Sequence, residues 1–422
     1  KVLISKVMKE EEDSFLRTLE TGIRLLDRVM AETRASGKTV IDGVEAFTLF
    51  DTYGFPLDLT ELICRENGMT VDEETFHAEM QKQKERARNA AAVETGDWVV
   101  VKEGETEFKG WDYTEHECHI LRYRKVTQKK QTFYQIVLDY TPFYAEMGGQ
   151  IGDTGVIRCG EAVFEVTDVQ KNKGGKFMHY GKLVSGSLSV GDTVTASIDE
   201  KRRKAIMRAH SATHLLDYAL RTVLGDHAHQ AGSLVEPDRL RYDFTHFSAV
   251  TADELVKISR LVSELVLGGM RVETKEMPID EAKKLGAIAL FGEKYGDVVR
   301  VVNMGGKSIE LCGGTHVDNT AKVGPFRITS ESSVASGVRR IEAVTGEAFL
   351  NLVDEMNARL VKAAEMLKTT PMELINKAQS SMNEIRELHQ TVEKMKDKLF
   401  AGDVDSLMFS AKDVSGLKVV TA

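Results

Sequence analysis

Apolar side chains recur every three or four positions near the start of the chain, at Phe15, Leu19, Ile23, Leu26 and Met30. This spacing predicts an amphipathic helix. Asp42 and Glu45 fit a capping box that would begin a second helix. Gly54 and Pro56 then interrupt the helical pattern, and further helices are expected up to the alanines at 90–92. Residues 1–92 are therefore predicted to form a helical region.

Short β-rich runs separated by glycine-containing turns begin near Gly96. They are WVVV (98–101), FYQIVL (133–138), GVIR (155–158), AVFEVTDV (162–169) and DTVTASI (192–198). Several short strands with turn residues between them are typical of a small antiparallel barrel or sandwich. We assign residues 93–198 to a β-barrel.

A mixed α/β core is predicted for residues 199–348, with a helix that opens near Lys201. Helical spacing returns in residues 349–400, where Thr370 and Glu373 fit a helix start with a capping box. An apolar stripe follows at Met382, Ile385, Val392, Met395 and Leu399. This stripe predicts a helical hairpin or a short coiled coil, although a helix packed on its own domain would show the same pattern. The whole pattern indicates an α+β multidomain fold.

The composition agrees with a soluble protein of several domains. The chain has 422 residues, of which 42% are hydrophobic and 29% charged, so roughly two to four folding units are expected. No apolar run reaches the ~18–20 residues that span a bilayer, and the charged N-terminus has no signal-peptide pattern. The four cysteines form no CxxC pair, which favours the cytoplasm over a disulfide framework. The net charge of −9 argues against non-specific coating of nucleic acid.

Two short motifs combine into a metal-binding set. His210 and His214 are four residues apart, which places them on one face of a helix. Cys312 and His316 are separated by Gly-Gly-Thr, and glycines permit a tight turn that brings both side chains together. Three imidazoles and one thiolate suit tetrahedral zinc. The HExxH metalloprotease motif is excluded, because Ser211 stands where that motif needs Glu.

The role of the zinc stays open at this point. Four protein ligands are typical of structural zinc, whereas catalytic zinc keeps a position open for water or substrate. Either one ligand is displaced during the reaction, or the zinc shapes the pocket.

Six segments, in this order, resemble those of alanyl-tRNA synthetases: LFDTYGFPLDLT (49–60), TPFYAEMGGQIGDTG (141–155), HQAGSLVEPDRLRYDF (229–244), ALFGEKYGDVVRVV (289–302), ELCGGTH (310–316) and SGVRRIEAVTG (336–346). The metal motifs look like those of the family's editing domain. One position departs: the family's ESGGQ reads EMGGQ here, with Met147 in place of serine. The resemblance covers nearly the whole chain.

The resemblance implies a fragment organised as a helical tRNA-recognition region (1–92), a β-barrel (93–198), a zinc-dependent editing core (199–348), a helical hairpin or coiled coil (349–400) and the start of a truncated C-terminal domain (401–422). The chain starts with Lys, and the ATP-binding class II motifs and the family's GGKGGG signature are not found. The aminoacylation domain, which uses ATP and Mg²⁺, is thus expected outside this chain. A homodimer of the intact protein is compatible with the family.

The implied substrate is tRNA(Ala) that wrongly carries serine or glycine, and the implied reaction is hydrolysis of its ester. Such a second site is needed because a pocket for alanine rejects smaller side chains and added hydroxyls poorly. Thr213 and Gln230 are candidates to read the serine hydroxyl or to orient water, and Asp217 and Glu310 are nearby acids. For Thr213 the alternative is a hydroxyl bonded to its own helix backbone, and for Gln230 an exposed loop position.

A basic cluster at the start of the predicted metal helix is the candidate site of phosphate contact, because the helix dipole disfavours cations there. Its members are Lys201, Arg202, Arg203, Lys204 and Arg208, joined by Arg339 and Arg340. The alternative is a solvated face paired with neighbouring acids. The family also reads the acceptor-stem G·U pair partly through an Asp, and the resemblance carries that role to Asp51, which could equally sit in an Asx-turn.

Two other functions remain open. A free-standing trans-editing hydrolase would share the barrel and the zinc core but would lack residues 1–92. A tRNA-binding module without catalysis would keep the zinc in a structural role.

Overall fold

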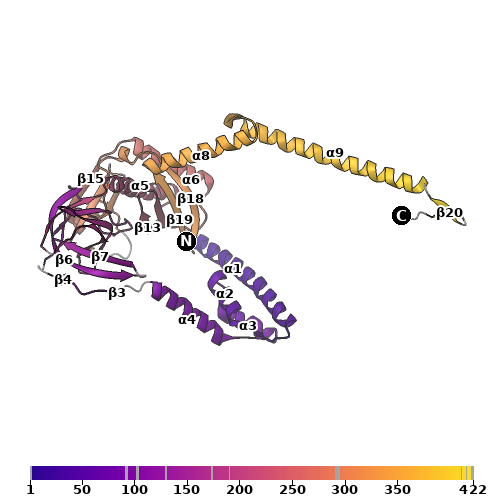
Figure 1. Ribbon diagram of the computed structural model, residues 1–422, viewed down its shortest axis with the longest axis horizontal. Coiled ribbons are helices and arrows are strands. Elements are labelled where there is room, and N and C mark those ends of the chain that lie inside the picture. Colours follow the sequence, from indigo (N-terminus) through magenta and orange to yellow (C-terminus); the bar gives the residue numbers. More distant parts are fainter. Residues whose placement is uncertain are drawn as a thin grey trace. The chain divides into compact units, whose positions relative to one another are not determined.

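The structure is a computed structural model that describes residues 2–90, 94–100, 104–128, 131–172, 174–189, 191–289, 295–409, 411–414 and 416–419. The chain divides into two compact units, Lys1–Phe349 and Leu350–Ala422, whose elements are labelled in Figure 1. The expected boundary between residues 92 and 93 lies outside the described residues, as does most of the segment 289–294 of one family motif.

The predicted N-terminal helices are present. They are α1 (Val2–Ala35), α2 (Gly43–Tyr53), α3 (Leu57–Glu66) and α4 (Glu73–Ala90), with a short parallel pair of β1 (Val40–Ile41) and β2 (Thr70–Val71). Asp42 caps α2 by accepting a hydrogen bond from the Val44 amide, and Gly54 ends that helix with a left-handed φ of 68°. Leu26, Ile41 and Phe55 are fully buried in the shared core. Asp42 and Gly54 therefore act where the sequence places them, but the cap is a bond to the Val44 amide and not the reciprocal capping box predicted with Glu45.

The β-region closes into a barrel rather than a sandwich. Six antiparallel strands follow one another in the order β6 (Glu115–Gln128), β7 (Gln131–Leu138), β11 (Phe177–Ser185), β10 (Ala162–Lys171), β9 (Gly155–Cys159) and β12 (Thr193–Ile198). β12 pairs back onto β6 and closes the ring. Shorter strands lie beside it: β3 (Glu94–Thr95) and β4 (Val99–Val100) on β6, and the parallel pair β5 (Glu107–Phe108) and β8 (Tyr140–Thr141).

The α/β core is built around the long helix α5 (Glu200–Leu224), which Asp199 caps by accepting from the Arg202 amide. A four-stranded antiparallel sheet consists of β13 (Gln230–Val235), β14 (Leu240–Thr245), β19 (Val338–Thr345) and β18 (Phe326–Ala335). A second antiparallel sheet contains β15 (Val272–Pro278), β16 (Val298–Met304) and β17 (Ser308–Leu311). The remaining elements are α6 (Ala252–Leu267), α7 (Ile279–Lys284) and the 3₁₀ turn Thr320–Val323.

Helix α5 is enclosed by this core. Its residues Ile206, Leu215 and Leu220 are fully buried among side chains of both β14 and α6. Each such side chain contributes about 1.5–3 kcal/mol by leaving water. The helix that carries the histidine pair is therefore held rigidly in place.

The C-terminal unit begins within α8 (Gly346–Met366), which is followed by the 3₁₀ turn Pro371–Glu373, α9 (Leu374–Phe409) and the hairpin of β20 (Lys412–Val414) and β21 (Leu417–Val419). The predicted capping box at Thr370 does not form, because its side chain makes no capping hydrogen bond and a 3₁₀ turn precedes α9. In the apolar stripe Met382 and Leu399 are 60% and 69% exposed. The helical hairpin or coiled coil therefore stays a prediction. Residues 420–422 of the expected C-terminal domain start lie outside the described residues.

Among the helices that the structure describes, none combines the length and the apolar character needed to cross a membrane.

Candidate metal centre

Two segments far apart in the sequence bring four metal-binding side chains together. His210 and His214 project from α5, and Cys312 and His316 lie in the loop after β17. The ligand atoms of all four lie within 4.8 Å of one another. The Cys312 sulfur is 3.4 Å from His210 Nε2 and 3.3 Å from His316 Nε2. Tetrahedral zinc with bonds of 2.0–2.3 Å separates its ligand atoms by roughly 3.3–3.8 Å, so this donor set fits zinc.

Each imidazole has a neighbour on the side that faces away from the centre. His210 Nδ1 is 2.8 Å from Gln150 Oε1, and His316 Nδ1 is 3.1 Å from Ser211 Oγ. His214 Nδ1 lies 3.3 Å from a Glu310 carboxylate oxygen, without hydrogen-bond geometry among the described residues. Partners of this kind orient ligating histidines and leave Nε2 for the metal.

Burial keeps the three imidazoles neutral. It lowers the pKa of His214 to about 3, with a further contribution from the Arg300 guanidinium. Burial, followed by the neighbouring His214 for His210 and by the neighbouring His210 for His316, holds the pKa of both rings well below the usual value of 6.5. A neutral imidazole keeps the lone pair that a metal needs, so the site is ready to bind a cation at neutral pH.

The turn that carries Cys312 depends on one of its two glycines. A β-carbon at Gly314 would come within 1.9 Å of the His210 ring, so only glycine lets the loop approach the helix this closely. At Gly313 the nearest atom would be the flexible end of Met147, 3.0 Å away. The Arg300 guanidinium holds the turn by donating to the carbonyl oxygens of Cys312 (2.7 Å) and Gly314 (2.9 Å).

Gln150 is a member of the site that the sequence analysis did not assign. It belongs to the barrel, is fully buried, and accepts a hydrogen bond from the Thr315 amide (2.8 Å) while donating to Thr315 Oγ1 (3.0 Å). Together with its contact to His210, it connects both ligand-bearing segments. The sequence signal that could have identified Gln150 is the EMGGQ motif, which ends at this residue.

A pocket of about 570 Å³ opens beside the metal ligands. His210, His214 and Cys312 line it, together with both predicted pocket residues, Thr213 and Gln230. The Thr213 hydroxyl donates to the Ala209 carbonyl oxygen at 2.9 Å. This is the bond to its own helix backbone that the sequence offers as the alternative to a role in substrate contact. Gln230 begins β13 and donates to Ser233 Oγ at 3.0 Å, so it is ordered within the pocket wall and not a free loop side chain.

Two buried carboxyl groups complete the wall, Asp217 and Glu310. Burial raises the pKa of each to about 7, and for Asp217 the charge of Glu310 adds to the effect. Asp217 accepts from the Tyr242 hydroxyl at 2.5 Å, and Glu310 accepts from Ser308 Oγ at 2.6 Å. Two acids with pKa values near neutrality could exchange protons at physiological pH.

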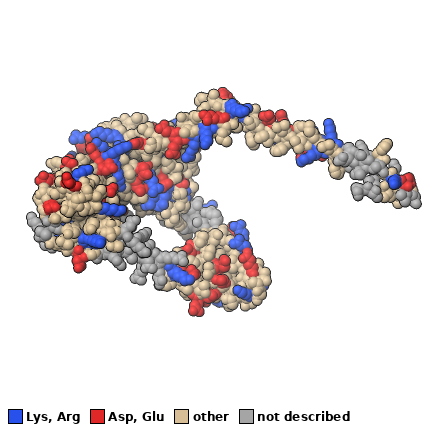
Figure 2. All heavy atoms as spheres, in the orientation of Figure 1, with Lys and Arg blue, Asp and Glu red and all other residues tan. Residues whose placement is uncertain are grey.

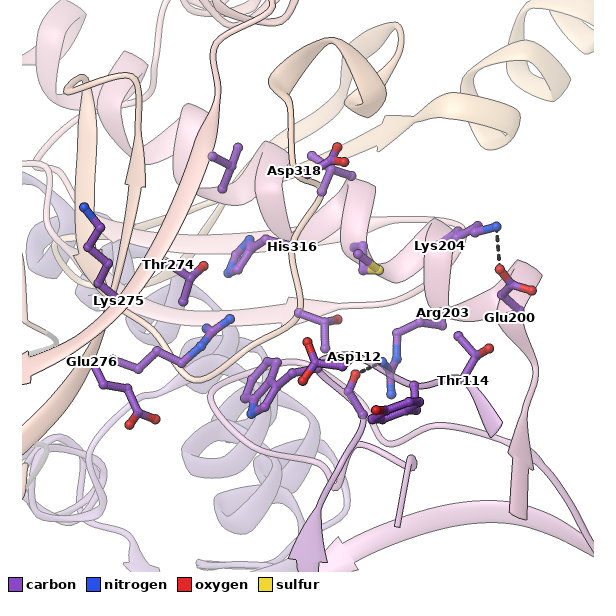
Figure 3. A pocket seen from close by; sticks show the side chains of 18 residues that line it. Asp112, Thr114, Glu200, Arg203, Lys204, Thr274, Lys275, Glu276, His316 and Asp318 are labelled. Carbon is purple, nitrogen blue, oxygen red and sulfur yellow. Dashed lines mark hydrogen bonds and ion pairs between the residues drawn. The ribbon is translucent and has the colours of Figure 1, made fainter. Parts of the chain in front are cut away.

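A second cavity, of about 580 Å³, lies on the His316 side of the loop and is drawn in Figure 3. Its charged residues balance in sign: Arg203, Lys204, Lys275 and Arg300 against Asp112, Glu200, Glu276 and Asp318. An anionic ligand would gain little net attraction there. The cavity beside the other three ligands is therefore the better candidate for a reaction site.

Several of the basic residues proposed for tRNA contact have partners within the protein. Arg203 is buried, pairs with the Asp153 carboxylate, and donates to the Gly110 (2.8 Å) and Pro142 (2.9 Å) carbonyl oxygens. It therefore anchors α5 to the barrel instead of facing solvent. Lys204 points toward Glu200, 2.6 Å away, as Figure 3 shows.

Four other members of this group, Arg202, Arg208, Arg339 and Arg340, are half-buried. Arg202 donates to the Gly152 carbonyl oxygen at 2.8 Å. Arg339 makes a two-point ion pair with Glu331, and Arg340 makes one with Asp243. Basic and acidic side chains are interspersed on the face in Figure 2. The contact of these residues with tRNA stays a prediction.

Asp51 lies in the last turn of α2, exposed, and accepts from Gln83 Nε2 at 2.6 Å. It therefore does not sit in a free Asx-turn, and its role stays a prediction.

The comparisons with known proteins agree with this architecture. The family of class II (A) tRNA synthetases matches residues 1–202, and the second additional domain of threonyl and alanyl tRNA synthetases matches residues 299–342. Alanine–tRNA ligase of Bacteroides fragilis is 54% identical over 421 residues, covering 100% of this chain and 48% of the relative. The enzymes of Bacteroides thetaiotaomicron (52%, with 100% and 48% covered) and Acetivibrio thermocellus (46%, with 99% and 49%) are also similar.

The first of these matches places residues 1–202 in the family of class II (A) tRNA synthetases. Within that class the chain belongs to the alanine–tRNA ligase family. It spans about half the length of the curated relatives that it matches. The second match includes Cys312 and His316, so half of the candidate ligand set lies in a segment shared with threonyl and alanyl enzymes.

Proposed function

We propose that this chain binds tRNA(Ala) and hydrolyses the ester of Ser-tRNA(Ala) or Gly-tRNA(Ala) in the pocket beside His210, His214 and Cys312. The observation that carries the proposal is the pocket itself, where three of the four ligand side chains share a wall with buried polar groups. A zinc site with a purely structural role would not need an open cavity beside its metal ligands.

The residues present suit an editing pocket. Gln230 and Thr213 are close enough to the ligands to line the same cavity, where they would contact the serine side chain. Glu310, which lies against the ring of His214, is the acid available for proton transfer. Zinc held by His210, His214, Cys312 and His316 would supply a positive charge that polarises the ester carbonyl or acidifies water.

Domain roles follow from the same proposal. Residues 1–92 would recognise the acceptor stem with Asp51, residues 93–198 form the barrel, and residues 199–348 edit. Arg202, Lys204 and Arg208 would contact phosphates. The intact protein would charge tRNA(Ala) with alanine in the cytoplasm, through an ATP- and Mg²⁺-dependent domain, and could form a homodimer.

The test is release of serine from Ser-tRNA(Ala). The zinc-loaded chain should hydrolyse this ester at least about 100-fold faster than buffer, and Cys312→Ala should remove that activity together with the zinc. Cys159→Ala is the matched control, because Cys159 is a half-buried thiol on barrel strand β9. The Cys159→Ala variant should keep both the hydrolytic activity and the zinc.

One observation favours a second function. Four protein ligands form a complete tetrahedral set, which suits a tRNA-binding module with structural zinc. If the zinc-loaded chain binds tRNA(Ala) without accelerating deacylation, and Cys312→Ala changes only its melting temperature, that second function is correct and the editing proposal fails.

A further inference from the structure

One face of α5 extends the pocket beyond the metal ligands. His210, His214, Asp217 and Arg221 follow one another at helical spacing, and all of them line the pocket. Three residues of helix advance about 4.5 Å. Asp217 therefore lies roughly one turn beyond His214 along the pocket wall.

Asp217 presents an unused acceptor at this point of the wall. Asp217 as a whole is only 5% exposed. Oδ1 accepts from the Tyr242 hydroxyl at 2.5 Å, whereas Oδ2 is buried and makes no hydrogen bond within the part of the chain that the structure describes. A buried carboxylate oxygen without a partner is destabilising, so a ligand that donates a hydrogen bond here would recover that free energy.

The other carboxyl group of the pocket wall is already engaged. Glu310 accepts from Ser308 and lies against the ring of His214. Asp243, on β14, is held at both oxygens by Arg340. Asp217 is thus the carboxylate in this pocket that is placed to receive a cation.

We propose that Asp217 Oδ2 binds the α-ammonium group of the aminoacyl ester while the ester carbonyl lies at the metal end of the pocket. This assignment rests on the proposed editing function and adds a specificity element to it. Serine and glycine esters both carry the ammonium group, so one carboxylate would serve both substrates. N-blocked aminoacyl esters and hydroxyacyl esters lack the ammonium and would be rejected.

The physical basis is a charge-assisted hydrogen bond in a buried setting. Such a bond contributes about 1.5–3 kcal/mol, and the ammonium lowers the cost of keeping Asp217 ionised, since burial otherwise raises its pKa to about 7. The Tyr242 bond fixes the carboxylate plane, so Oδ2 is directed before substrate arrives.

Nitrous acid converts Ser-tRNA(Ala) into the glyceroyl ester, which has a hydroxyl in place of the ammonium. With rates divided by the uncatalysed rate of each ester, the zinc-loaded chain should prefer the seryl ester by about 10–100-fold. Asp217→Asn should remove that preference by slowing the seryl ester, and should leave the glyceroyl rate within about threefold. Asp238→Asn, an exposed matched control, should change neither rate. An equal loss on both esters would make Asp217 structural and overturn the assignment.

A binding measurement separates this proposal from the editing proposal. Adenosine carrying serine through a 3′-amide is not an ester, and calorimetry can compare it with its glyceroyl counterpart on the wild-type chain. Tighter binding of the seryl compound by about 10–100-fold, in a chain that hydrolyses nothing, would support the Asp217 contact while the editing proposal fails. Equal binding of the two compounds would overturn the assignment whatever the hydrolysis rates are.

Discussion

Histidines are buried in two regions of this molecule, with opposite arrangements around the ring. In the barrel, His179 is fully buried, its Nδ1 bonds the Ile136 carbonyl oxygen at 3.0 Å, and its Nε2 bonds the Thr141 hydroxyl at 2.7 Å. Both nitrogens are therefore used. In the α/β core, His210 and His316 use only Nδ1 on neighbouring protein groups and direct Nε2 toward Cys312.

This difference separates a structural histidine from a ligand. Burial lowers the pKa in both regions, to about 4 for His179 and about 3 for His214, so the pKa alone does not distinguish them. What distinguishes them is whether the second ring nitrogen is left to point toward the position on which the other ligand atoms converge.

The largest effect is expected from removing a ligand. His316→Ala should abolish zinc binding and lower hydrolysis of Ser-tRNA(Ala) by at least about 100-fold, because the metal loses one of its four protein ligands. His179→Ala should keep the zinc and lose only stability. Metal content by atomic absorption and serine release are the measurements. Zinc retained by His316→Ala would contradict the ligand assignment.

The next largest effect concerns the contact between helix α5 and the barrel. Arg203→Met leaves the buried Asp153 carboxylate unpaired and should lower the free energy of unfolding by about 3–5 kcal/mol. Lys204→Met, one residue along, breaks an exposed pair and should change stability little. Urea unfolding of both variants decides this. Similar stabilities would mean that Arg203 does not anchor α5 to the barrel.

A pH effect follows from His179. Its pKa in the folded state is lowered to about 4 from 6.5. The unfolded chain therefore takes up a proton between pH 6.5 and 4 that the folded chain does not. Its contribution to stability is complete above pH 6.5 and falls by on the order of 3 kcal/mol as the pH drops to 4. Apo protein should show this slope in urea titrations, and His179→Gln should flatten it relative to wild type. An unchanged slope would refute the prediction.

The smallest effect is expected at Gln150. Gln150→Ala removes the partner of His210 Nδ1 and should weaken zinc affinity by about 10–100-fold without removing the site. Gln170→Ala changes an exposed glutamine of the same barrel and is the control. Competition with a fluorescent chelator measures both affinities. Equal affinities in the two variants would show that the barrel does not tune the centre.

The sequence predicts the elements of this protein where local signals are strong. Asp42 and Gly54 set the ends of α2 through a side-chain cap and a left-handed turn, and both are local properties. All five β-rich runs coincide with strands in whole or in part. Val101 of the first run lies outside the described residues. Strands β6 and β11 were not predicted, because charged residues and a buried histidine break the usual alternation.

By itself the sequence determined which residue types could hold a metal, because spacing on a helix and around a tight turn is local. It also carried the family resemblance that the comparisons confirm. Only the tertiary structure decided that Gln150 of the barrel contacts His210 and that Arg203 lies inside the protein. It also decided that Asp217 keeps one oxygen in the pocket without a hydrogen bond to any described residue. These facts depend on burial and on contacts between distant segments, which no local pattern contains.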